Sequence, residues 1–286
     1  MITFNKAAEA VPPQAWFGVS AIFHYLGPSF AVLLFPAVGV IGVAWFRIAS
    51  AALIFAPFTK PWKVLGEADR RERILLIGLG ICLAVMNTSF YLALDRLPMS
   101  LVAAMEFIGT ICVALYGLRT GRNLLALALA ILGVLILIDA KWATDSVGLF
   151  WAVLNAILFV GYIVLGHQAA EGGATDGVER LGAAMFIAFL LLMPVGFLQA
   201  VEVMGVPALV LAGIGVGVCS SVIPYICDQL AMSRLPRASF ALMMALLPAS
   251  ATVIAALVLA QIPSPRDITG VLLVMMGIAI HRPKAG

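Results

Sequence analysis

Long apolar runs alternate with short polar segments along the whole chain, and this alternation predicts helices that cross a lipid bilayer. We expect spans at about residues 15–34, 38–58, 74–94, 99–118, 123–139, 147–168, 181–201, 207–229, 238–260 and 267–281. A helix needs roughly 20 apolar residues to cross the hydrocarbon core. The runs lack the alternating polarity of barrel strands, so the sequence predicts an all-α polytopic membrane protein with ten transmembrane helices.

The last five predicted spans repeat features of the first five. Gly78-Leu79-Gly80-Ile81-Cys82 corresponds to Gly215-Val216-Gly217-Val218-Cys219, and Arg96-Leu97-Pro98 corresponds to Arg234-Leu235-Pro236. An odd number of spans per repeat turns the second copy over in the membrane. We therefore expect two inverted repeats, residues 1–141 with helices one to five and residues 142–286 with helices six to ten. Such inversion is typical of carriers that alternate access to a site near the midplane.

Composition and charge agree with this picture. The 286 residues are 63% hydrophobic and 11% charged, with a mean hydropathy of +1.12, which leaves too little polar surface for a water-soluble protein of this size. If the N-terminus is inside, only three basic residues fall in outside segments: Arg96, Lys141 and Arg266. The positive-inside rule then puts both termini in the cytoplasm. We expect the membrane to be a bacterial-type inner membrane. The net charge of +3 marks orientation rather than a nucleic-acid partner, and we expect a monomer.

The sequence gives little sign of redox, metal or enzyme chemistry. The four cysteines lie in apolar runs without CxxC spacing, which favours packing: Cys82, Cys112, Cys219 and Cys227. The three histidines are scattered, without the nucleophile or paired aspartates that an intramembrane hydrolase requires. A phosphate-binding loop of the GxxxxGK[ST] type is missing, so a gradient rather than ATP would supply the energy. We expect no cofactor, no metal and no enzymatic activity.

A series of short motifs runs along the chain in a specific order. They are Leu34-Phe35-Pro36-Ala37-Val38-Gly39, Arg47, Pro61-Trp62, Met86-Asn87, Phe90-Tyr91-Leu92, Glu106-Phe107, and Pro224-Tyr225 with Arg234-Leu235-Pro236. This order resembles the EamA-like branch of the drug/metabolite transporter superfamily, most of all its threonine and homoserine exporters. The resemblance implies ten helices in two inverted repeats, and a cavity lined mainly by helices one, three, four, six, eight and nine. The chain departs from it at Leu246-Leu247-Pro248, where related exporters have a Glu before the proline of helix nine.

Two charged side chains lie well inside predicted spans, away from both ends of the span. A charge at the bilayer centre costs about 2.5 to 3.5 kcal/mol on insertion scales, so each should face a cavity or a partner. Glu106 in helix four either binds a substrate ammonium group, carries a proton, or is a structural carboxylate. Arg47 in helix two either forms a structural or gating pair with Glu106 or meets a substrate carboxylate.

Other candidates lie beside predicted helix breaks. His24 and Tyr25 precede Gly27-Pro28 of helix one, where proline leaves a carbonyl free to accept from a ligand. His24 either takes up a coupled proton or only packs. In helix three Asn87 and Tyr91 share a face. Pro224 and Tyr225 occupy the matching position in helix eight, which predicts two matching breaks near the midplane that mark the binding region.

Two further groups complete the candidate site. Asn155, Phe159 and Tyr162 recur at helical spacing in helix six, and this stripe faces either substrate or a neighbouring helix. Asp228 and Gln229 lie near the inner end of helix eight, where they either form an inner gate or Asp228 is only a solvated helix terminus. Arg47 and Asp228 are thus the candidates for gating or coupling.

These observations favour a secondary exporter of small amino acids or related metabolites that works by alternating access. Its specificity is either threonine- and homoserine-like or broad enough to include aromatic amino acids. Proton exchange through Glu106 or His24 and passive facilitated efflux fit the sequence equally well. A metabolite or drug efflux carrier of other specificity and a passive channel are the alternatives left open.

Overall fold

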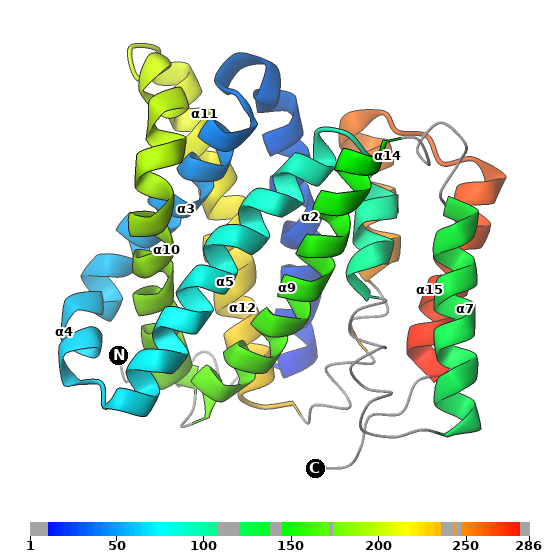
Figure 1. Cartoon of the computed structure of the whole chain (residues 1–286), viewed down its shortest axis with the longest axis horizontal. Helices are drawn as coiled ribbons and strands as arrows, with labels where there is room; N and C mark the ends of the chain where they lie inside the picture. The colour runs from blue at the N-terminus through cyan, green and yellow to red at the C-terminus, as the bar shows by residue number, and fades with distance from the viewer. Residues whose placement is uncertain are drawn as a thin grey trace. The chain divides into compact units, whose positions relative to one another are not determined.

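The computed structural model describes residues 11–107, 120–137, 145–171, 174–235, 243 and 247–280. Within these ranges the regular elements are all helices, drawn as coiled ribbons in Figure 1. Six segments in the described part are long and apolar enough to cross a membrane: α2 (Pro13–Val38), α3 (Val40–Thr59), α5 (Arg70–Leu94), α9 (Ser146–Ala170), α10 (Ala174–Glu202) and Pro207–Met232. The protein is therefore a polytopic helical membrane protein, as predicted.

The remaining described helices are shorter. They are α4 (Pro61–Glu67), a helical stretch at 99–107, α7 (Gly121–Leu137), α14 (Leu247–Leu259) and α15 (Pro265–Ile280). The predicted spans at 99–118 and 238–260 lie partly outside the described residues, so the count of ten spans stays a prediction. The short helix α4 lies between two predicted spans, and its seven residues are too few for hydropathy to indicate.

Several helices extend beyond the predicted spans. α5 begins at Arg70 rather than at residue 74, because charged residues form its solvated first turn and the Asp69 carboxylate accepts from the Glu72 backbone N–H at 2.7 Å. α2 runs without interruption through Pro28 and Pro36 to Val38, so Gly27-Pro28 does not end the helix. Placing boundaries at charges and near Pro36 shortened these elements, because charged residues are tolerated in a solvated helix end and α2 continues through its prolines.

Only one of the two predicted helix breaks is present. Helix eight consists of α11 (Pro207–Gly217), the π-helical turn η1 (Val218–Val222) and α12 (Ile223–Met232). α5 is an unbroken α-helix through Asn87, so the matching break predicted there is wrong. The physical reason is that α5 lacks a proline, whereas Pro224 cannot donate to the carbonyl four residues before it.

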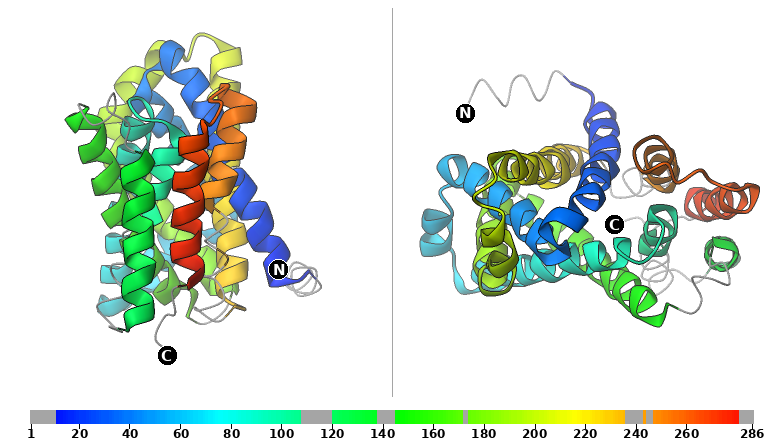
Figure 2. Two further views of the ribbon diagram at one scale, coloured as in Figure 1. Left: turned by 90° about the vertical axis from the view of Figure 1, so that its right-hand side faces the viewer. Right: turned by 90° about the horizontal axis from the view of Figure 1, so that it is seen from above.

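The chain forms two compact units. The first comprises Met1–Thr88 and Gly161–Leu235, and the second comprises Ser89–Val160 and Pro236–Gly286. In the first unit α3 packs along α10, where a β-carbon at Gly196 would lie 2.5 Å from Trp45 Cβ. In the second unit α7 and α15 lie side by side in both Figure 1 and Figure 2. A β-carbon at Gly133 would lie 2.6 Å from the Gly270 carbonyl oxygen, so small residues bring these backbones together.

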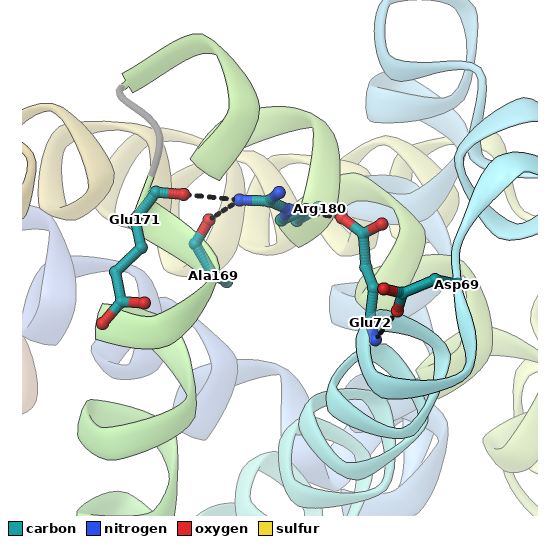
Figure 3. Close-up of polar contacts among 5 residues, drawn as sticks. All are labelled: Asp69, Glu72, Ala169, Glu171 and Arg180. Carbon is teal, nitrogen blue, oxygen red and sulfur yellow. Dashed lines mark hydrogen bonds and ion pairs between the residues drawn. The ribbon is translucent and has the colours of Figure 1, made fainter.

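A group of polar contacts around Arg180 joins three segments of the first unit. Arg180 of α10 donates from Nε to Glu72 of α5 at 2.7 Å. Its Nη1 donates to the carbonyl oxygens of Ala169 at 3.1 Å and Glu171 at 2.7 Å (Figure 3). One guanidinium thus ties the start of α10 to α5 and to the end of α9.

Candidate functional site

A buried carboxylate lies where three helices of the first unit meet. Asp228 of α12 is 6% exposed, and its two oxygens accept from Ser20 Oγ of α2 at 2.5 Å and from the Tyr162 hydroxyl of α9 at 3.3 Å. No basic side chain of the described residues lies within 4.0 Å of this carboxylate. Asp228 is therefore not a solvated helix terminus. An ionised carboxylate at this depth is unfavourable unless a proton or a cation neutralises it.

Two tyrosine rings in a tilted contact link Asp228 to further polar side chains. The Tyr162 and Tyr225 ring centroids are 5.4 Å apart with an interplanar angle of 36°. The Tyr225 hydroxyl donates to Asn87 Oδ1 of α5 at 3.0 Å, and Asn87 Nδ2 donates to the Leu83 carbonyl at 2.7 Å. Tyr225 and Asn87, which the sequence placed at matching positions of two helices, are therefore hydrogen-bonded to each other.

Arg47 of α3 lies against the irregular part of helix eight. Its Nη2 donates to the Ser220 carbonyl oxygen at 3.0 Å and its Nε donates to Ser221 Oγ at 2.9 Å, with the side chain 3% exposed. Ser220 is four residues before Pro224, so its carbonyl is the one that loses its α-helical donor. Arg47 also interacts electrostatically with Tyr225 and His24. The guanidinium thus supplies a donor where the proline removes one.

The turn of α2 that carries Gly27 packs directly on this irregular segment. A β-carbon at Gly27 would lie 2.5 Å from the Ser220 backbone nitrogen and 2.7 Å from the Cys219 carbonyl carbon. Only glycine allows this approach. One helical turn earlier, His24 is half-buried and contacts the edge of the fully buried Tyr25 ring, with centroids 5.3 Å apart.

We call Ser20, Arg47, Asn87, Tyr162, Tyr225 and Asp228 the first-unit polar cluster. Its members come from α2, α3, α5, α9 and α12. Each is at most 6% exposed. Buried polar side chains of this number, linked by hydrogen bonds and a ring contact inside membrane-spanning helices, mark this part of the unit as the candidate site.

The second unit carries a separate buried carboxylate. Glu106 is 2% exposed, and its Oε1 accepts from Asn155 Nδ2 of α9 at 2.8 Å. The Asn155 Oδ1 atom has no hydrogen-bond partner among the described residues. Phe107 and Phe159 form an edge contact beside this pair, with centroids 5.9 Å apart. Tyr91, also predicted for the site, is fully buried in this unit.

The predicted residues therefore form two groups. His24, Tyr25, Arg47, Asn87, Tyr162, Tyr225 and Asp228 belong to the first unit, and Tyr91, Glu106 and Asn155 belong to the second. A single site built from both groups, and the pairing of Arg47 with Glu106, stay predictions. Within the first unit, Arg47 has its own partners on η1.

Sequence reasoning missed three serines of this site, whereas it predicted that Gln229 forms an inner gate with Asp228. Ser20 lies four residues before His24 and therefore on the same face of α2, which is the signal that could have identified it. Ser220 and Ser221 are indicated only by their closeness to Pro224. Gln229 is fully buried, and neither atom of its amide has a hydrogen-bond partner among the described residues. A buried amide without partners is costly and rare in native proteins.

Comparisons with known proteins agree on one group of relatives. The sequence profile of the EamA-like transporter family matches residues 146–281. The chain is 32% identical over 242 residues to the threonine/homoserine exporter RhtA of Escherichia coli (strain K12), covering 84% of this chain and 80% of that protein. It is 32% identical over 230 residues to threonine/homoserine exporter RhtA of Salmonella typhimurium (strain SL1344), covering 79% of this chain and 76% of that protein. A protein of known crystal structure, 18% identical, superposes with a TM-score of 0.62 over 93% of this chain and 96% of its own, which indicates a shared fold.

Proposed function

The chain belongs to the EamA-like transporter family, and we propose that it is a secondary transporter that exports small amino acids by alternating access. Its relatives in two enteric bacteria are named threonine/homoserine exporters, which supports a small, polar, zwitterionic substrate. The family consists of transporters, in agreement with the prediction that the chain is not an enzyme.

The observation that carries this proposal is the first-unit polar cluster. It holds an acid, Asp228, and a base, Arg47, and the contacting rings of Tyr162 and Tyr225 lie on the path of contacts between them. A carboxylate attracts the ammonium group of an amino acid, and a guanidinium offers paired donors to its carboxylate. Hydroxyl and amide groups of the same cluster suit the polar side chain of threonine or homoserine. In the second unit, Glu106 is a further candidate for binding the ammonium group.

The predicted inverted repeats, residues 1–141 and 142–286, supply the mechanism. α2, α3 and α5 of the cluster come from the first repeat, and α9 and α12 come from the second. Relative movement of the two repeats would therefore rearrange every contact that joins them in the cluster. The family profile matches residues 146–281, within the second repeat, which supports a boundary between the repeats near residue 142. We further propose that the protein is a monomer of the inner membrane with both termini in the cytoplasm.

Net release of amino acids from liposomes tests this function. Vesicles that contain the purified protein and are preloaded with labelled threonine, homoserine, methionine or phenylalanine should release one or more of them faster than protein-free vesicles. Threonine and homoserine are expected to leave fastest. Release of the whole panel at the protein-free rate would show that the substrate assignment is wrong.

A further inference from the structure

We propose that the Asp228 carboxylate, held by the hydroxyl groups of Ser20 and Tyr162, takes up and releases the proton that drives export. This inference rests on the proposed function and adds to it the ion that is coupled to transport and the group that binds it. The sequence indicated Asp228 only as a gating or coupling residue and named Glu106 and His24 as the candidates for the proton.

The Ser20 hydroxyl can serve both protonation states of Asp228. Its Oγ lies 2.5 Å from Asp228 Oδ1 and 3.3 Å from the Pro224 carbonyl oxygen. When the carboxylate is ionised, Ser20 donates to Oδ1 and Tyr162 donates to Oδ2. When Oδ1 carries the proton, it donates to Ser20 Oγ, and Ser20 turns its own proton toward the Pro224 carbonyl. A hydroxyl group can donate one hydrogen bond and accept others, so both arrangements are satisfied without movement of the backbone.

The charge environment favours a proton as the ligand. Asp228 is buried among hydroxyl donors, without a basic side chain within 4.0 Å in the described part of the chain. Each stage of transport must therefore either neutralise the carboxylate or expose it to water. A proton meets this need in the observed geometry, because it adds no volume to a packed site. On release, the proton passes to water on whichever side the site is open.

The neighbouring elements carry several other titratable or charged groups. They are His24 and Tyr25 of α2, Tyr162 and His167 of α9, Asp176, Glu179, Arg180 and Glu202 of α10, Cys219 of η1, and Tyr225 and Cys227 of α12. The one arginine of this set, Arg180, pairs with Glu72 at 2.7 Å. His24 lies near Arg47, Tyr162 donates a hydrogen bond to Asp228 at 3.3 Å, and Tyr225 and Cys227 lie close enough to feel the charge of Asp228. Protonation of Asp228 therefore removes the negative charge that the Ser20 and Tyr162 hydroxyl groups face.

Protonation changes the contact between the two predicted repeats. Ser20 belongs to the first repeat, whereas Tyr162 and Asp228 belong to the second. A hydrogen bond to an ionised carboxylate is roughly twice as strong as one between neutral groups. Loss of the charge thus weakens the contact between α2 and α12, which is the coupling that a proton-driven carrier needs.

The test compares two transport modes in proteoliposomes that contain purified full-length protein. Counterflow of labelled threonine at equal pH on both sides needs no net proton movement, whereas threonine accumulation driven by a pH gradient does. For Asp228→Asn, which mimics the neutral form, we expect gradient-driven accumulation to fall about tenfold or more relative to counterflow by the same variant. Glu202→Gln, a neutralised exposed acid at the end of α10, should retain both modes.

Ser20→Ala provides a second test that does not remove the carboxylate. Loss of this donor disfavours the ionised form more than the neutral one, so the pH profile of gradient-driven transport should move to higher pH. If the wild-type protein shows counterflow and both variants keep the pH dependence of the wild type, the inference is overturned and the proposed function stays intact. Wild-type counterflow without any response to a pH gradient would also overturn it. Absence of wild-type counterflow for every amino acid tested would instead refute the proposed function.

Discussion

The Arg47 guanidinium donates a 3.0 Å hydrogen bond to the Ser220 carbonyl oxygen, the acceptor that Pro224 leaves without its α-helical donor. The proline, the π-helical turn and the buried arginine are therefore parts of one arrangement. Proline disrupts helix eight inside the bilayer, and the arginine of α3 provides the compensating hydrogen bonds. Non-helical backbone at membrane depth is tolerated only where protein groups or water satisfy it, and it is often found at transport sites.

The first prediction concerns the shape of the Arg47 side chain. Arg47→Lys keeps the charge but cannot donate to both Ser220 O and Ser221 Oγ with the fixed geometry of a guanidinium. A buried acceptor left unpaired costs about 1 to 3 kcal/mol, so the thermal unfolding midpoint in detergent should fall. Arg96→Lys is the control, because the Arg96 side chain is 46% exposed and its ion pair with Asp145 is 3.5 Å long. Equal midpoints for the two variants would argue against a structural role of the guanidinium.

The second prediction concerns the contact of α2 with the π-helical turn. Gly27→Ala places a β-carbon 2.5 Å from the Ser220 backbone nitrogen, and backbone cannot yield as a flexible side chain can. We expect a loss of about 1 to 3 kcal/mol in the free energy of unfolding, typical of overpacking. Gly18→Ala on the same helix meets no atom within 4 Å and should leave the unfolding midpoint unchanged or slightly raised. If Gly27→Ala is as stable as Gly18→Ala, the two segments are not in contact.

The third prediction separates charge from hydrogen bonding at Glu106. Glu106→Gln keeps an oxygen that can accept from Asn155 Nδ2 and removes the negative charge. If the carboxylate binds the substrate ammonium group, threonine efflux should slow about tenfold, equivalent to roughly 1.4 kcal/mol, while the unfolding midpoint stays near that of the wild type. Efflux at the wild-type rate would assign Glu106 a structural role only.

The fourth prediction uses the unpaired amide of Gln229. Gln229→Met has a similar volume and removes two buried polar atoms that lack partners among the described residues. The variant should be more stable by about 1 kcal/mol, because the cost of an unsatisfied amide is removed. Threonine efflux should fall, since we expect the amide to gain a partner in another state of the transport cycle. Gln168→Met at an exposed position is the control, and a Gln229→Met protein less stable than that control would contradict the prediction.

Much of the fold follows from hydropathy alone. The predicted spans at 38–58 and 207–229 match Val40–Thr59 and Pro207–Met232 closely, because uniform apolar runs fix where a helix crosses the membrane. The short helix α4 and the early start of α5 were not predicted, since both lie in charged segments where hydropathy gives no signal.

The candidate site was predicted less completely than the fold. Asp228, Arg47 and Tyr225 stand out because charged and aromatic polar residues are rare in apolar spans. Ser20 and Ser221 do not stand out, because serine is common at packed helix interfaces and only the fold shows which hydroxyl groups face Asp228 or Arg47. The π-helical turn also required the structure, because proline near a helix midpoint more often produces a simple kink.

Counterflow of labelled threonine in proteoliposomes tests the central claim most directly. Vesicles that contain purified wild-type protein and a high internal concentration of unlabelled threonine or homoserine should transiently accumulate external labelled threonine above its equilibrium level. Such an overshoot requires a binding site that is exposed alternately to the two sides of the membrane. A simple rise to equilibrium without overshoot would indicate a passive pore, and labelled threonine uptake no faster than in protein-free vesicles would contradict the account.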